Sequence, residues 1–294
     1  MSFRDEKVLS LLGTNLDELS EEELKKLCHK ILKSKIYGIC FSLYEGSQQP
    51  GDIVSDDQII RRLEILKPYT SSIRTFSSLN EHARIVEIAK DMGFKTLVGA
   101  WLSDDMDSND KEVEGLIKLA NNDLVDVAAV GNEVIYRKEL EESQLISYIN
   151  YVKERINNIP VGYVDAYYEF RDRPNITNAC DVILANCYPF WEGCAAEYSL
   201  LYMKDMYNEA IKASNGKKVI ITETGWPSKG SDLWGAHPSY TNYLKYFINA
   251  QLWSKDQGID MFYFSSFDES WKIEAEGDVG AYWGLWDKDE VIKF

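Results

Sequence analysis

The sequence predicts an α/β fold, a single (β/α)8 TIM barrel with an N-terminal helix. Short apolar segments of strand length alternate with amphipathic segments of helical periodicity. The two recur together at intervals of roughly 30 residues, which is typical of strand–helix units in a parallel sheet. The chain has 294 residues, and such a barrel typically needs roughly 250.

Apolar segments of the length and composition of buried strands occur eight times. In chain order they cover residues 36–43, 72–76, 96–101, 125–133, 160–167, 181–188, 218–223 and 259–267. A doubly wound open sheet is the alternative arrangement. No glycine-rich phosphate loop follows the first segment, so the barrel is favoured.

The helix ahead of the first strand is predicted from its start signal. Ser20 and Glu23 have the spacing of a capping box, and leucine and isoleucine then recur at helical intervals. No change in composition marks a linker. We therefore expect one catalytic domain over residues 1–294, with 1–35 as a helical lead-in and 36–294 as the barrel.

Amphipathic segments between the strands predict the outer helices. Apolar residues recur at helical spacing in 57–66, 81–92 and 140–156. The segment 169–179 is short and polar, so we expect an abbreviated unit there without a regular helix.

The composition and charge of the chain limit the classes of molecule that it is expected to bind. The net charge is −16, from 48 acidic and 32 basic residues, which repels nucleic acid and suits a neutral substrate. No apolar run approaches the ~18 residues that span a bilayer, so no membrane partner is expected.

The three histidines and five cysteines lack metal-ligand spacing, so we expect no metal and no cofactor. A Cys187–Cys194 disulfide stays open, and we expect a monomer.

The N-terminus lacks a secretory leader, because Met1–Lys7 is polar and leads into an acidic helical segment. The sequence as it stands predicts a cytoplasmic protein. A secreted or periplasmic protein whose leader has been removed is the alternative.

Two glutamates close apolar strand segments. Glu133 ends the segment 125–133, and Glu223 follows 218–222. A carboxylate is costly to bury unless something uses it, and barrel active sites lie at the carboxyl ends of the strands. Two carboxyl groups at one barrel mouth can break a glycosidic bond, one as acid and the other as nucleophile or base.

The neighbouring sequence resembles glycoside hydrolase family 17. The motifs are Ala-Val-Gly-Asn-Glu-Val at 129–134, Asn-Cys-Tyr-Pro at 186–189, Thr-Glu-Thr-Gly-Trp-Pro-Ser at 222–228 and Phe-Asp-Glu-Ser-Trp-Lys at 267–272. The resemblance begins at Tyr37 and extends to the end of the chain. It implies a retaining enzyme of the β-1,3-glucanase and transglycosylase type, with Glu133 as acid/base and Glu223 as nucleophile. Retention needs carboxyl groups about 5–5.5 Å apart.

The resemblance also implies supporting roles. Arg74 and Tyr188 would hold the nucleophile ionised, and Asn132 would bind the sugar 2-hydroxyl. Glu269 and Lys272 match a Glu-x-x-Lys pair that would shape the field near the acid/base or bind sugar.

Aromatic residues at the strand ends are candidates for stacking on sugar rings. Trp191 and Trp226 are the two that we assign to substrate binding. Phe41 and Tyr44 belong to the same group. Phe41 stands where plant members of the family have a tyrosine, so the hydroxyl contact is missing or comes from Tyr44 or another residue. The chain looks closer to microbial members than to plant ones.

The leading prediction is a retaining hydrolase that cleaves β-1,3-glucan of the laminarin type, acting endo through a covalent glycosyl-enzyme. A β-1,3-glucosyltransferase or an exo-β-1,3-glucanase on the same site is the close alternative. A non-catalytic glucan-binding barrel is the alternative of another class.

Overall fold

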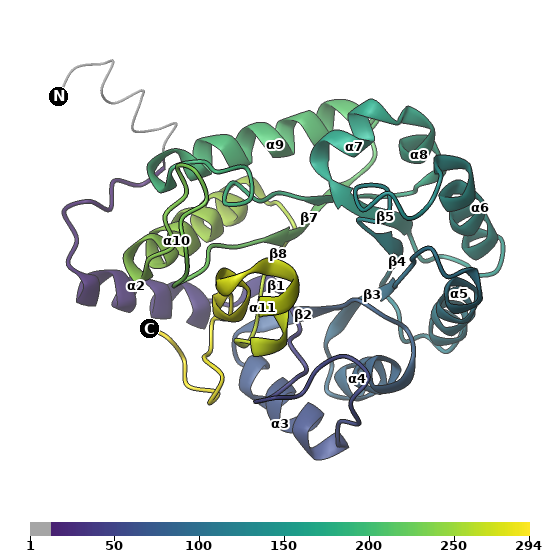
Figure 1. The fold of residues 1–294 in the computed structure, drawn as a ribbon, viewed down its shortest axis with the longest axis horizontal. Helices are drawn as coiled ribbons and strands as arrows, with labels where there is room; N and C mark the ends of the chain where they lie inside the picture. The colour runs from purple at the N-terminus through teal and green to yellow at the C-terminus, as the bar shows by residue number, and fades with distance from the viewer. Residues whose placement is uncertain (1–12) are drawn as a thin grey trace.

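The computed structural model describes residues 13–294 as a closed barrel of eight parallel strands. Each strand pairs with the next along the chain, and β8 pairs with β1 to close the barrel. Figure 1 shows the strands at the centre with the helices around them. The predicted (β/α)8 TIM barrel is confirmed.

The strands match the eight predicted segments, with small shifts at their ends. They are β1 Ile36–Cys40, β2 Thr70–Thr75, β3 Lys95–Ala100, β4 Val127–Asn132, β5 Val161–Ala166, β6 Ile183–Asn186, β7 Val219–Thr224 and β8 Met261–Tyr263.

Strand β8 is shorter than the predicted segment 259–267. Beyond Tyr263 the backbone leaves the ladder: the N–H of Ser265 donates to Trp283 and that of Ser266 to Cys40. Residues 264–267 are nevertheless buried. Their apolar character therefore reflects packing at the barrel end and not strand pairing.

The helices follow the predicted order. They are α2 Glu21–Lys33, α3 Asp56–Leu66, α4 Asn80–Asp91, α5 Met106–Asn121, α6 Glu142–Lys153, α7 Tyr167–Asp172, α8 Pro174–Ala179, α9 Ser199–Ala213, α10 Tyr240–Gln257 and α11 Ile273–Glu276, with the short 3-10 turns η1 Ala196–Tyr198, η2 Ser270–Lys272 and η3 Asp278–Tyr282. The capping box at the start of α2 is confirmed: Ser20 Oγ accepts from the N–H of Glu23, and Glu23 Oε2 accepts from the N–H of Ser20 at 2.8 Å. Residues 1–12 of the predicted lead-in lie outside the described residues. Within residues 13–294, no helix combines the length and apolarity needed to cross a bilayer.

The prediction for residues 169–179 was wrong. This segment contributes to two six-residue helices, α7 and α8. Pro174 opens α8, and Arg173 before it is non-helical with φ −130° and ψ 74°. A proline suits the first position of a helix but disfavours helix in the residue before it. The unit is split at this point and stays helical on both sides.

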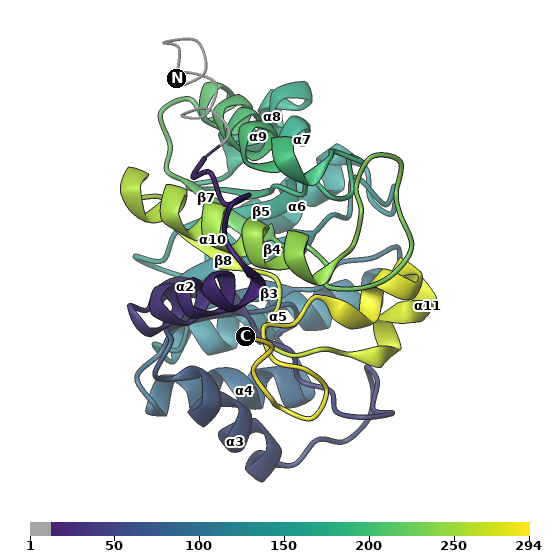
Figure 2. The same cartoon turned by 90° about the vertical axis from the view of Figure 1, so that its left-hand side faces the viewer.

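The barrel mouth is the end where the parallel strands finish. The chain after β8 crosses this end, and Figures 1 and 2 both show α11 there, close to β1 and β8 in the first view and at one edge of the molecule in the second. Every residue of β7 is buried. Both faces of such strands are covered, so they read as continuous apolar runs without alternation. A carboxylate at the end of such a run therefore reaches the mouth from a rigid support.

Candidate active site

A backbone bend at the end of β4 presents Glu133 to the mouth. Gly131 and Glu133 both have left-handed backbone, with φ 88° and 52°, and the pairing of β4 with β5 shifts between Ala129 and Asn132. A Cβ at Gly131 would lie 3.2 Å from the ring of Tyr163, so this position requires glycine for both its angle and its space. Such irregularities re-aim side chains at strand ends.

Glu223 is held by donors from two other strands. Its side chain is 6% exposed. Arg74 Nη1, from β2, donates to Glu223 Oε1 at 2.5 Å, and the Tyr188 hydroxyl, just after β6, donates to Oε2 at 2.9 Å. Arg74 Nη2 also donates to Asn132 Oδ1 at 2.7 Å. The structure thus brings the predicted nucleophile together with its two predicted donors and with Asn132, which was predicted to bind the sugar 2-hydroxyl.

Asn186 bridges the two glutamates. Its Nδ2 donates to Glu133 Oε1 at 2.8 Å and to Glu223 Oε1 at 3.2 Å. Because one nitrogen reaches both, the two Oε1 atoms cannot be farther apart than these two bonds laid end to end. This upper limit allows the carboxyl spacing of retaining enzymes, which is about 5–5.5 Å. It is smaller than the carboxyl spacing of inverting enzymes, which is roughly 6.5–9.5 Å. Thr222 Oγ1 donates to Asn186 Oδ1 at 2.8 Å and so fixes which end of the amide faces the carboxyl groups.

The surroundings of Glu133 favour its protonated form. Burial raises the pKa of Glu133 above its ordinary value, and the nearby Glu223 carboxylate raises it further. The Asn186 hydrogen bond and the charges of Arg74 and Arg137 oppose this rise. A carboxyl with a raised pKa beside one held by donors has the two environments that general-acid and nucleophilic roles need.

The turn after Glu133 rests on a buried acid of β5. Asp165 Oδ2 accepts from the N–H of Tyr136 at 3.3 Å and from the Tyr163 hydroxyl, which itself accepts from the N–H of Ile135 at 2.9 Å. Burial raises the pKa of Asp165 to about 7. These contacts hold the bend that carries Glu133.

The comparisons with known proteins agree with this geometry. The profile of the BtgE/BtgC glycoside hydrolase domain matches residues 38–284. A glycoside hydrolase family 17 β-1,3-glucanosyltransferase of Rhizomucor miehei has a solved structure that is 30% identical and superposes with a TM-score of 0.80, over 89% of this chain and 96% of that one. The chain belongs to glycoside hydrolase family 17.

Further relatives extend the comparison. A glucan 1,3-beta-glucosidase of Arthroderma benhamiae is 30% identical over 278 residues, covering 86% of this family 17 chain and 88% of the relative. An endo-laminarinase of Formosa Hel1_33_131 superposes with a TM-score of 0.75 over 89% of this chain and 86% of that one. It is 19% identical, so it supports the fold alone.

The Glu-x-x-Lys pair of this family 17 chain lies on the nucleophile side of the mouth. Lys272 Nζ and Glu269 Oε2 are 2.8 Å apart, and Glu269 Oε1 accepts from the N–H of Tyr44 at 3.0 Å. Lys272 also lies 4.3 Å above the ring of Phe264. The charges that most affect the pKa of Glu133 are those of Glu223, Arg74 and Arg137. The prediction that Glu269 and Lys272 shape the electrostatic field near Glu133 therefore finds no support here. Sugar binding by the pair stays a prediction.

The two tryptophans predicted to bind substrate have different surroundings in the structure. Trp226 is fully buried and its N–H donates to the carbonyl of His237 at 3.2 Å. The prediction that Trp226 contacts sugar was wrong, because its ring packs against Phe190 and Tyr246 in the core. Trp191 is 38% exposed and is free to stack on a ligand.

The residues after β1 are more buried than predicted. Phe41 and Tyr44 both belong to the core. The Tyr44 hydroxyl donates to Glu81 at 3.0 Å, so its proton is already engaged and it could meet a sugar hydroxyl only as an acceptor. The assignment of the two residues to the substrate-binding or supporting group stays a prediction.

The cysteines are unpaired. All five lie within the described residues and are free, including Cys187 and Cys194. The disulfide that the sequence left open is not formed.

Several site residues were missed by the sequence reasoning. Asn186 is the first residue of a family motif, but nothing in the sequence indicates that its side chain bridges two carboxyl groups. Asp165 is an acid inside an apolar strand, the same signal that pointed to the glutamates. Arg137, which donates to the backbone carbonyls of Asn132 and Leu102, carries no signal of its own.

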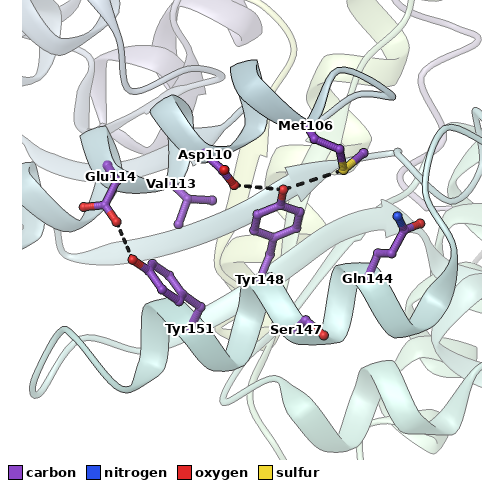
Figure 3. A pocket seen from close by; sticks show the side chains of 8 residues that line it. All are labelled: Met106, Asp110, Val113, Glu114, Gln144, Ser147, Tyr148 and Tyr151. Atoms are coloured by element: carbon purple, nitrogen blue, oxygen red, sulfur yellow. Dashed lines mark hydrogen bonds between the residues drawn. The ribbon is translucent and has the colours of Figure 1, made fainter.

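A separate hollow lies on the outer surface between α5 and α6. Its volume is about 460 Å³. Figure 3 shows Tyr148 and Tyr151 of α6 reaching across to Asp110 and Glu114 of α5. These bonds tie the two helices together. No predicted site residue lines this hollow.

Proposed function

We propose that this protein is a retaining β-1,3-glucan hydrolase with Glu133 as acid/base and Glu223 as nucleophile. The bridge that Asn186 makes between the two carboxyl groups carries the proposal, because it keeps their Oε1 atoms closer together than the spacing that inverting enzymes use. The raised pKa of Glu133 supports its role as the acid.

The reaction has two steps in this geometry. Glu223 attacks the anomeric carbon while Glu133 gives its proton to the glycosidic oxygen, so the bond to the leaving sugar breaks and a glycosyl ester forms. Glu133, now a carboxylate, then takes a proton from water as the water oxygen attacks the same carbon and releases Glu223. Arg74 and Tyr188 donate to the two oxygens of the nucleophile and aim it, and Asn132 offers its amide to the sugar 2-hydroxyl.

The substrate class is supported by chemistry and by likeness. Relatives at 30% identity are named glucan 1,3-beta-glucosidase and β-1,3-glucanosyltransferase. One solved structure of the latter, an active-site mutant, holds laminaritriose. The acidic surface suits a neutral polysaccharide, and we propose endo-cleavage of laminarin-like chains.

Transfer to a second sugar is the alternative that a specific observation favours. Trp101, just after β3, is 40% exposed, and the Arg137 guanidinium lies 4.6 Å from its ring. Arg137 also contacts the carbonyl of Asn132, so the indole lies on the Glu133 side, where the leaving sugar departs. An aromatic platform there would hold an acceptor sugar against the glycosyl ester.

Two glutamate variants test the mechanism. We expect Glu223→Ala to lose all activity on laminarin, and Glu133→Ala to regain part of its activity with azide and an activated aryl donor, since azide needs no base. Unchanged activity of Glu223→Ala would refute the mechanism.

Product lengths from a linear β-1,3-glucan then separate the outcomes. A mixture of mid-sized oligosaccharides supports endo-hydrolysis. Products longer than the substrate establish transfer, and early release of single terminal units establishes the exo mode.

A further inference from the structure

The turn after β4 that carries Glu133 is bound to two side chains of the neighbouring strand β5. The N–H of Ile135 donates to the Tyr163 hydroxyl at 2.9 Å, and the N–H of Tyr136 donates to Asp165 Oδ2 at 3.3 Å. The Tyr163 hydroxyl in turn donates its own proton to Asp165 Oδ2. The two side chains therefore form one hydrogen-bonded unit that accepts two successive N–H groups of the turn.

The Tyr163–Asp165 pair is built from fully buried side chains. Both residues are 0% exposed, and their separation by two positions on β5 places both side chains on the same face of the strand. Asp165 Oδ1 accepts from the N–H of Ala166 at 2.7 Å, so each carboxyl oxygen has a donor. Burial raises the pKa of Tyr163 well above its ordinary value, so this hydroxyl keeps its proton. A buried carboxyl group is costly unless its hydrogen bonds are made, and here those bonds hold the turn.

The backbone of Glu133 needs such support. Its φ of 52° is left-handed, which is costly for a residue other than glycine and persists only where the surroundings fix it. The N–H of Glu133 donates to the carbonyl of Val164 at 2.8 Å. The Tyr163 ring lies 3.2 Å from the position that a Cβ at Gly131 would occupy. Tyr163 therefore meets the chain on both sides of Glu133, with its ring at Gly131 and its hydroxyl at Ile135.

The proposed nucleophile is held by a separate set of groups. Glu223, on β7, accepts hydrogen bonds from side chains of β2 and of the end of β6. A shift of the Glu133 turn would therefore move the acid and leave those donors to Glu223 in place. A misplacement of about 1 Å can cost a reaction roughly a hundredfold in rate.

We propose that Tyr163 and Asp165 are positioning residues for proton transfer by Glu133. Tyr163 fixes the turn through the N–H of Ile135, and Asp165 fixes both the Tyr163 hydroxyl and the N–H of Tyr136. The inference rests on the proposed function, in which Glu133 protonates the leaving sugar, and it adds the residues that place this proton donor.

Two donors that differ only in their leaving group test this role. Phenyl β-laminaribioside releases a poor leaving group that needs a proton, whereas dinitrophenyl β-laminaribioside releases a good one that does not. Tyr163→Phe keeps the ring and removes the acceptor for the N–H of Ile135. We expect its kcat/KM to fall about tenfold or more on the phenyl donor and less than about twofold on the dinitrophenyl donor. A general loss of active enzyme would lower both values equally.

A second variant and a matched control accompany Tyr163→Phe. Asp165→Asn keeps the size of the side chain and weakens the acceptor for the Tyr163 proton, so a smaller fall confined to the phenyl donor is expected. Tyr243→Phe is the control, because its buried hydroxyl donates to the carbonyl of Gly284 at 3.1 Å, away from the Glu133 turn, and neither value should change. Equal falls of Tyr163→Phe on both donors, or no fall on either, would overturn the proposal. If Tyr163→Phe does not fold, Asp165→Asn decides by the same criterion.

The proposed function fails in a different way. Glu133→Ala is measured on the same two donors, and an acid role requires a far larger loss of kcat/KM on the phenyl donor. If that selectivity is absent, or if the parent protein cleaves neither donor, the role of Glu133 is wrong. Amide hydrogen exchange of residues 133–137 still reports whether the pair holds the turn. Faster exchange in Tyr163→Phe than in the parent supports the holding role, and unchanged exchange overturns it.

Discussion

Replacing Asn186 by alanine removes a side chain that donates to both Glu133 and Glu223, the proposed acid/base and nucleophile. In the intact site the Asn186 hydrogen bond lowers the pKa of Glu133, against the rise that burial and Glu223 produce. Its loss therefore raises the pKa of Glu133. Glu133 must be protonated in the free enzyme for the first step, so kcat/KM falls as pH rises through this pKa. The basic limb of the profile should move to higher pH in Asn186→Ala.

The size of the shift follows from the 2.8 Å bond to Glu133 Oε1. A hydrogen bond to a charged group contributes about 1.5–3 kcal/mol, and one pKa unit corresponds to about 1.4 kcal/mol. We expect the basic limb to move up by about one to two units. The maximal rate should fall by about tenfold or more, because Glu223 loses one of its three side-chain donors.

The assay is kcat/KM on nitrophenyl β-laminaribioside between about pH 4 and pH 9. Thr222→Val is the matched control, because it removes the 2.8 Å bond that orients Asn186 and leaves the donor itself in place. Its basic limb should move less than that of Asn186→Ala. A basic limb that stays in place or moves to lower pH, in an Asn186→Ala protein with unchanged thermal unfolding, would refute the reasoning.

Three further predictions follow from single contacts. Tyr188→Phe removes the hydroxyl that donates to Glu223 at 2.9 Å and keeps the ring packed against Trp283, so kcat/KM should fall about tenfold or more with little change in melting temperature; an unchanged kcat/KM would contradict the contact. Asp165→Asn should flatten the pH dependence of stability measured by urea unfolding. Because the pKa of Asp165 rises from 3.8 to about 7 in the folded protein, the native state binds the extra proton and the parent loses stability as pH rises across that window; an equally steep variant would contradict this. Gly131→Ala places a Cβ 3.2 Å from the Tyr163 ring at φ 88°, so we expect a loss of about 1–3 kcal/mol in unfolding free energy and a misplaced Glu133, and a variant of parental stability and activity would count against the strain.

Local sequence signals predicted most of the fold. The eight apolar segments became β1 to β8, and the Ser20 capping box begins α2 as predicted. The predicted extent of the last strand was wrong for residues 264–267, which are buried but do not pair in the sheet. Apolar composition indicates only that a residue is buried and not that it belongs to a strand. The prediction was also wrong at residues 169–179, where short polar helices are stabilised by packing and not by their own periodicity.

The proposed catalytic pair could be chosen from the sequence, because a glutamate that closes an apolar strand is costly to bury unless it has a function. The parallel order of the strands then implied that Glu133 and Glu223 share one mouth. Arg74, Tyr188 and Asn132 came from the family resemblance, and the structure joins them to Glu223 or to each other.

Distances and exposure were decided only by the tertiary structure. Asn186 bridges both glutamates because β4, β6 and β7 bring their ends together, while Trp226 points into the core and the Tyr44 hydroxyl is bound by Glu81. A motif fixes which residue stands at a strand end, but side-chain direction depends on neighbours far away in the chain.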